Sequence, residues 1–94
     1  MKDKYLQRLR EIIFKHIDSR KTRAFIFGSS IKNQRFFFDV DVGFTGRVDA
    51  KQLNILQDEL EESTFPYKVD LVDFTKTEKS FHDYVFNHEV KWLN

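Results

Sequence analysis

The chain contains no cysteine, one proline and only three glycines among its 94 residues. Without cysteine it can form neither a disulfide scaffold nor a zinc–thiolate site, and it offers no thiol nucleophile. The scarcity of proline and glycine favours a compact domain with short turns. Because no repeat, low-complexity segment or linker interrupts the sequence, we expect a single domain spanning residues 1–94.

The sequence also lacks long apolar runs and an excess of charge of one sign. No apolar stretch approaches the roughly 20 residues of a membrane span, and the charged start Met1-Lys-Asp-Lys does not resemble a signal peptide. Sixteen basic and 15 acidic residues give a formal net charge of +1, whereas dedicated nucleic-acid binders usually show a clear basic excess. We therefore expect a cytoplasmic protein with no membrane association and no direct nucleic-acid partner.

Apolar periodicity predicts an α/β domain. Three- and four-residue spacing of leucine and isoleucine predicts a helix over residues 3–18 and a second helix that begins at Asp49. Short strands are predicted at 24–27, 36–44 and 67–73. Thr75 and Glu78 resemble a capping box before a last helix, and Val90 and Trp92 alternate like a short edge strand. This order predicts an α/β sandwich, with a mixed β-sheet of three to four strands and its helices packed on one face.

Two aspartates interrupt the most aromatic of these strands. Alternation over residues 36–44 places Asp39 and Asp41 on one face, about 6–7 Å apart along the strand, and the large apolar residues mostly on the other. Strands disfavour aspartate, and an unpaired buried carboxylate is costly. Since the nearest basic residue on that face is Arg35, nothing local neutralises the pair.

A divalent cation would supply the missing positive charge. Mg²⁺ binds carboxylate oxygens and fills its remaining positions with water and substrate phosphates. Asp70, within the apolar strand 67–73, is a natural third ligand if the two strands are neighbours. Three such carboxylates suit two-metal phosphoryl transfer. The alternative is that these aspartates face solvent on an open sheet.

The segment Gly28-Ser29-Ser30 directly follows the first predicted strand. Glycine permits a sharp turn and a close approach of the backbone, and the N–H groups that follow can form an anion-binding nest or a helix start. Because the aspartate pair follows within a dozen residues, a phosphate held at this turn would lie near Asp39 and Asp41.

Three segments together resemble motifs of the polymerase-beta-type nucleotidyltransferase superfamily, and in particular its minimal nucleotidyltransferase (MNT) branch. They are Phe25-Ile-Phe-Gly-Ser, Asp39-Val-Asp-Val-Gly and Val69-Asp-Leu-Val-Asp, and the resemblance covers nearly the whole chain. It implies a single nucleotidyltransferase-type domain that binds two Mg²⁺ ions and takes ATP as its substrate.

The resemblance also implies a role for each matching residue. Gly28 and Ser29 would hold the triphosphate, Asp39 and Asp41 would bind the Mg²⁺ ions, and Asp70 would complete a metal site and help to deprotonate the attacking hydroxyl. The chain departs from the family pattern after Ser29. The usual Arg and Arg-Gly are replaced by a region containing Ser30 and Lys32, where Lys32 offers phosphate a point charge in place of a bidentate arginine. Phe38 stands where a serine often precedes the first aspartate.

Members of the MNT branch of this size are typically antitoxins paired with an all-helical HEPN toxin. The resemblance thus implies transfer of AMP to a hydroxyl of that toxin, most readily a tyrosine, within a hetero-oligomer. Two alternatives stay open. The departures after Ser29 suggest an antitoxin that neutralises the toxin by complex formation with little catalysis, and a small-molecule nucleotidyltransferase ranks lower because such enzymes normally carry an added helical domain.

Overall fold

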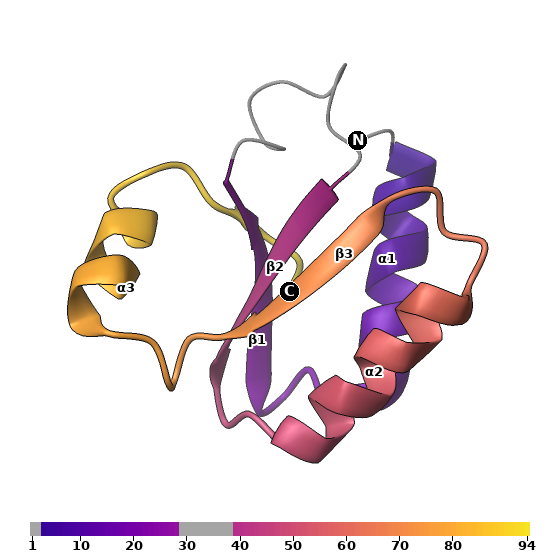
Figure 1. The fold of residues 1–94 in the computed structure, drawn as a ribbon, viewed down its shortest axis with the longest axis horizontal. Coiled ribbons are helices and arrows are strands. Elements are labelled where there is room, and N and C mark those ends of the chain that lie inside the picture. The colour runs from indigo at the N-terminus through magenta and orange to yellow at the C-terminus, as the bar shows by residue number, and fades with distance from the viewer. Residues whose placement is uncertain (1–2, 29–38) are drawn as a thin grey trace.

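A computed structural model describes residues 3–28 and 39–94 of the chain. In these residues three helices and four strands follow one another, and Figure 1 labels all of them except the last strand. They are α1 (Asp3–His16), β1 (Thr22–Phe27), β2 (Asp39–Gly46), α2 (Ala50–Glu62), β3 (Lys68–Asp73), α3 (Lys79–Phe86) and β4 (Lys91–Trp92). Each predicted element is present within these ranges, apart from residues 36–38 of the second predicted strand, which lie outside the described residues. None of the helices described has the length and hydropathy needed to cross a membrane.

The four strands form one mixed sheet in the order β3-β2-β1-β4. β1 runs antiparallel to both β2 and β4, whereas β2 and β3 are parallel. A parallel pair requires a crossover connection, and α2 provides it. The predicted mixed sheet of an α/β domain is therefore confirmed, with the two-residue β4 as its short edge strand.

The first face of the sheet is covered by α1 and α2 (Figure 1). Each helix turns its apolar stripe inward, as the three- and four-residue spacing predicts. The buried side chains of this layer are Leu6, Leu9, Ile13, Leu53, Leu56 and Leu60 from the helices, and Ala24, Ile26, Val40, Val42, Phe44 and Val69 from the strands. The helices are also joined at their surface, where Glu59 accepts from Lys15 Nζ at 3.2 Å and lies 3.0 Å from His16 Nε2.

The second face carries α3, so the prediction that all helices pack on one face was wrong for this helix. Figure 1 shows α3 across the sheet from α1 and α2. The cause is the composition of β1, which buries side chains on both of its faces. Phe25 and Phe27 point away from the first layer, and they form a second core with Phe74 and with Val85 of α3.

A side-chain cap marks the start of α2, whereas α3 begins without one. Asp49 is the N-cap of α2, as predicted, because its carboxylate accepts from the backbone N–H of Lys51 at 3.0 Å and of Gln52 at 3.3 Å. The predicted capping box at Thr75 is wrong. Thr75 instead donates to the Asp73 carboxylate from both its backbone N–H and its hydroxyl, and α3 begins one turn later with Glu78 as N-cap.

Candidate functional site

Strand register brings Asp41 and Asp70 together on the second face. Asp41 is the partner of Phe27 across the antiparallel β1–β2 pair and of Asp70 across the parallel β2–β3 pair. Register partners on neighbouring strands project from the same side of a sheet. Phe27, Asp41 and Asp70 therefore form one row across three strands, at the end of the sheet where β1 ends and β2 begins.

Asp39 extends the carboxylate group by one step along β2. It lies two residues before Asp41 and is therefore on the same face, in register with Lys68 of β3. Asp39 is exposed, whereas Asp41 and Asp70 are partly buried. The structure thus brings all three predicted aspartates to one end of one face, and their roles remain predictions.

Gly28 lies directly against the Asp41 carboxylate. Its φ of +85° belongs to the left-handed region that glycine adopts readily. A Cβ built at this position would lie 3.0 Å from Asp41 Oδ2, closer than ordinary packing allows. At Gly28 the bare backbone therefore comes close to the Asp41 carboxylate, and a side chain at this position would be strained. Ser29, Ser30 and Lys32, the other predicted phosphate ligands, lie outside the described residues.

The three carboxylates act on one another electrostatically. Burial raises the pKa of Asp41, and the negative charges of Asp70 and then Asp39 raise that pKa further. Within residues 3–28 and 39–94, none of the three forms an ion pair. In the same ranges, no group of three or more Asp, Glu, His or Cys side chains is close enough to hold a metal ion as it stands. The site therefore concentrates negative charge, and in the described part of the chain none of the three carboxylates is neutralised by an ion pair.

Sequence reasoning did not single out Phe27 as a neighbour of these carboxylates. Its ring belongs to the second core and contacts Phe74 at a centroid distance of 5.2 Å. The continuous apolar run Phe25-Ile-Phe was the available signal, because a strand that is apolar on both faces must be covered on both. The carboxylate row consequently has an aromatic wall at its β1 end.

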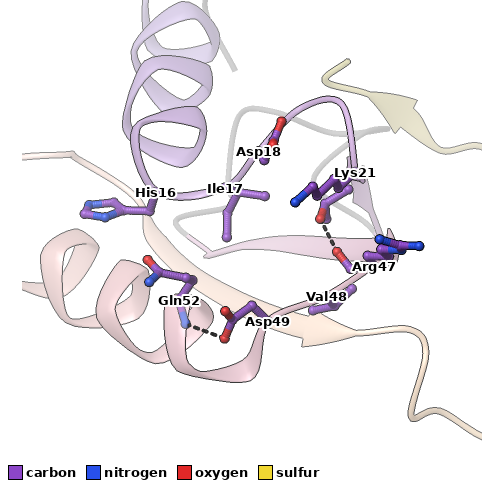
Figure 2. A pocket seen from close by; sticks show the side chains of 9 residues that line it. His16, Ile17, Asp18, Lys21, Arg47, Val48, Asp49 and Gln52 are labelled. Carbon is purple, nitrogen blue, oxygen red and sulfur yellow. Dashed lines mark hydrogen bonds between the residues drawn. The ribbon is translucent and has the colours of Figure 1, made fainter.

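A separate cavity of about 320 Å³ lies at the other end of the β1–β2 pair. Figure 2 shows its walls, which come from the end of α1, the start of β1, the end of β2 and the start of α2. Thr22 lines it and is in register with Gly46, whereas Asp41 pairs with Phe27 at the far end of the same strands. The acidic residues Asp18 and Asp49 of this cavity are already engaged, Asp18 with Arg20 and Asp49 with the N-terminus of α2. The cavity is therefore remote from the candidate site.

Comparison with known proteins finds similarity in structure and not in sequence. No protein-family model matches the chain, and no curated protein sequence matches it significantly. A crystal structure from Shewanella oneidensis superposes with a TM-score of 0.67 at 20% identity, covering 99% of this chain and 72% of that one. A second solved structure is the tri-AMPylated Shewanella oneidensis HEPN toxin in complex with MNT antitoxin, with a TM-score of 0.56 at 22% identity over 95% of this chain and 71% of that one.

These superpositions show that the chain shares its fold with an MNT antitoxin. In the described residues, three helices and a four-stranded mixed sheet form the small α/β fold expected of a nucleotidyltransferase-type domain. At this level of identity the similarity establishes the fold, and the chemistry must be argued from the site.

Proposed function

We propose that this chain is a Mg²⁺-dependent nucleotidyltransferase of the MNT type, which transfers AMP from ATP to a tyrosine hydroxyl of a partner HEPN toxin and so acts as its antitoxin. The observation that supports this most is the row in which Asp41 and Asp70 stand side by side, with Asp39 on the same face and Gly28 against the Asp41 carboxylate. The shared fold adds support, since the solved MNT antitoxin is in complex with a tri-AMPylated HEPN toxin.

The donor set fits magnesium. All three side chains offer hard carboxylate oxygens, which Mg²⁺ prefers. Burial raises the pKa of Asp41, and so do the negative charges of Asp70 and Asp39, which a cation would neutralise. Two Mg²⁺ ions supply charge stabilisation at the attacking and the leaving oxygens in reactions of this class. Because the carboxylates do not form a closed cluster in the described residues, we expect them to move closer together when the ions bind. Asp39 and Asp41 would hold the ions, and Asp70 would complete one site.

In the proposed reaction, residues of this chain position the acceptor hydroxyl and the phosphates of ATP. The acceptor oxygen attacks the α-phosphorus of ATP, the bond from that phosphorus to the bridging oxygen breaks, and pyrophosphate leaves. Asp70 would help to remove the proton of the attacking hydroxyl, and its place on the edge strand β3 leaves room for an acceptor on that side. Gly28 lets the turn after β1 approach the phosphates, and we propose Ser29, Ser30 and Lys32 as further phosphate ligands.

The test is to incubate the protein with ATP, Mg²⁺ and its partner toxin and to weigh the intact toxin by mass spectrometry. We expect adducts of AMP that disappear when Asp39 and Asp41 are both changed to asparagine. Asp58→Asn is the matched control, since Asp58 lies on α2 and is remote from the row. Adducts that persist in the double variant, or that never form with the wild type, would refute the catalytic proposal.

A second candidate is an antitoxin that neutralises the toxin by binding alone. The observation that favours it is that the carboxylates are not gathered into a metal-binding cluster in the described part of the chain. In that case the double asparagine variant should form no adduct and yet protect cells from the toxin as well as the wild type does. Loss of protection while the complex still forms would exclude this candidate.

A further inference from the structure

A layer of aromatic rings borders the carboxylate row on the second face of the sheet. Phe25, Phe27 and Phe74 are 0%, 8% and 4% exposed. Phe74 lies 4.9 Å from Phe25 and 5.2 Å from Phe27 between ring centroids. These three rings are ordinary core residues beneath α3, and they form a rigid floor for whatever packs on them.

Phe81 of α3 differs from these rings because it is 42% exposed. Its ring stacks on Phe74 at a centroid distance of 5.6 Å and an interplanar angle of 26°, and its edge meets Phe27 at 6.4 Å and 80°. Two buried rings therefore fix its orientation while a large part of it faces solvent. Such a ring can bind a flat apolar group at little cost in conformational entropy, because it is already ordered.

Phe81 is linked to the carboxylates through the ring of Phe27. Phe27, which touches Phe81, is the cross-strand partner of Asp41, and the Cβ atoms of such partners lie about 4.5–5.5 Å apart. Phe27 thus links the two residues, since it contacts Phe81 and pairs with Asp41. A triphosphate held at Gly28 and the carboxylates would extend its nucleoside over this face of the sheet, where the aromatic layer lies.

We propose that Phe81 is a stacking platform for the nucleobase of the bound nucleoside triphosphate. This rests on the proposed function and adds the residue that recognises the base. Every base has a π-face, so stacking on one ring favours nucleotides over inorganic polyphosphates without strong choice among bases. Phe81 is accordingly a binding residue and takes no part in the chemical step.

Tyr84 provides a matched control on the same helix. It is 62% exposed, and its ring packs against His88 at 4.4 Å. Among the described residues it makes no aromatic contact with Phe27 or Phe74. Removing the Tyr84 ring therefore takes a similar apolar group from α3 without disturbing the packing of Phe27 and Phe74.

The experiment measures binding of ATP and of inorganic tripolyphosphate, each with Mg²⁺, by isothermal titration calorimetry. Loss of base stacking costs about 1–3 kcal/mol, so Phe81→Ala and Phe81→Leu should weaken ATP binding about 5- to 150-fold. Both variants should bind tripolyphosphate like the wild type, while Phe81→Trp and Tyr84→Ala should retain ATP affinity. The leucine variant keeps an apolar side chain on Phe74 and serves if the alanine variant is unfolded.

The outcomes separate this inference from the function on which it rests. If the wild type binds both ligands and the Phe81 variants bind ATP equally well, the platform is refuted while the nucleotide site stands. An equal loss of ATP and tripolyphosphate binding in Phe81→Leu would also refute it, because the effect would then be structural. If the wild type binds neither ligand, the proposed function and the inference fail together.

Discussion

Asp41 and Asp70 are in-register partners on the parallel strands β2 and β3, so their carboxylates leave the same face of the sheet side by side. Few sheets place like charges opposite each other, because such pairs are destabilising. Retaining the arrangement at a partly buried position means that the folded state is under electrostatic stress at neutral pH. This repulsion should make the stability of the folded protein depend on pH, which can be measured without an activity assay.

The first prediction concerns Asp41 and pH. Its pKa in the folded state is raised above 3.8 by burial and by Asp70 and Asp39, so the folded protein binds a proton here more tightly than the unfolded chain. Stability should therefore fall as pH rises through this raised pKa. Asp41→Asn mimics the protonated form, so it should be more stable than the wild type at pH 7 and lose that advantage below about pH 3.8.

Urea denaturation at both pH values checks this, with Asp58→Asn as the reference for a remote carboxylate. The same stability difference at pH 3 and pH 7 would show that charge is not its cause.

The second prediction is that Asp70 is needed for AMP transfer and not for formation of the complex with the toxin. Removal of a group that assists proton transfer typically lowers a rate about 10²- to 10⁴-fold. We expect Asp70→Asn to reduce AMP transfer to the toxin by at least about 100-fold while size-exclusion chromatography still shows the complex. Transfer at the wild-type rate would remove Asp70 from the proposed machinery.

A third prediction tests the aromatic layer beside the site. A Cβ at Gly43 would lie 2.6 Å from Phe25 Cε2 and 2.6 Å from Phe74 Cε1, and both rings are buried. Overpacking of this kind costs about 1–3 kcal/mol, and each 1 kcal/mol lowers Tm by about 4–8 °C in a domain of this size.

Thermal melting of Gly43→Ala should show that decrease. Lys68→Ala, an exposed change on the neighbouring strand, should stay within about 0.5 kcal/mol of the wild type. Equal melting of the two variants would mean that the rings can move aside at no cost.

A fourth prediction concerns the link between α1 and α2. Hydrogen bonds from His16 and then Lys15 lower the pKa of Glu59 below 4.5. A lowered carboxyl pKa stabilises the fold above the unfolded value, and that contribution disappears as pH falls through the folded pKa. Glu59→Gln should therefore melt below the wild type at pH 7 and match it more closely under acidic conditions. Glu61→Gln on the same helix should show no such pH dependence, and a parallel response of both variants would contradict the link.

A fifth prediction tests the N-cap of α2, the helix that connects the two carboxylate strands. Asp49→Ala removes the acceptor for the Lys51 and Gln52 N–H groups, which costs about 0.5–2 kcal/mol. Differential scanning calorimetry should show the loss, whereas Lys51→Ala should have little effect. An unchanged Tm for Asp49→Ala would show that water caps the helix equally well.

The order of helices and strands and the shared face of Asp39 and Asp41 follow from local patterns in the sequence. Alternation in β2 predicts that Asp39 and Asp41 share a face opposite Val40 and Val42, and the structure places them there. That Asp70 would join them was conditional, because no local pattern states which strands are neighbours. The strand order makes Asp70 a neighbour of Asp41, since β2 lies between β1 and β3.

The side of the sheet on which α3 packs could not be predicted from the periodicity of α3 itself. An amphipathic helix reports which of its own faces is apolar and not which layer will receive it. The burial of β1 on both faces decides it, and that depends on the long-range packing of Phe25 and Phe27 against Phe74. The contacts of Phe81 with Phe27 and Phe74 could not be predicted for the same reason, since these neighbours come from other parts of the chain.

The crossover through α2 has a consequence for folding. Asp41 and Asp70 become neighbours only when β3 adds in parallel to β2, and such non-local pairing is intrinsically slow compared with a hairpin. β1 and β2 can pair as antiparallel neighbours before this happens. The Asp70 half of the acidic site is therefore missing from any early species that lacks β3, and the completed site forms only when β3 has joined the sheet. Pulsed hydrogen exchange should accordingly show the amides of β3 gaining protection after those of β1.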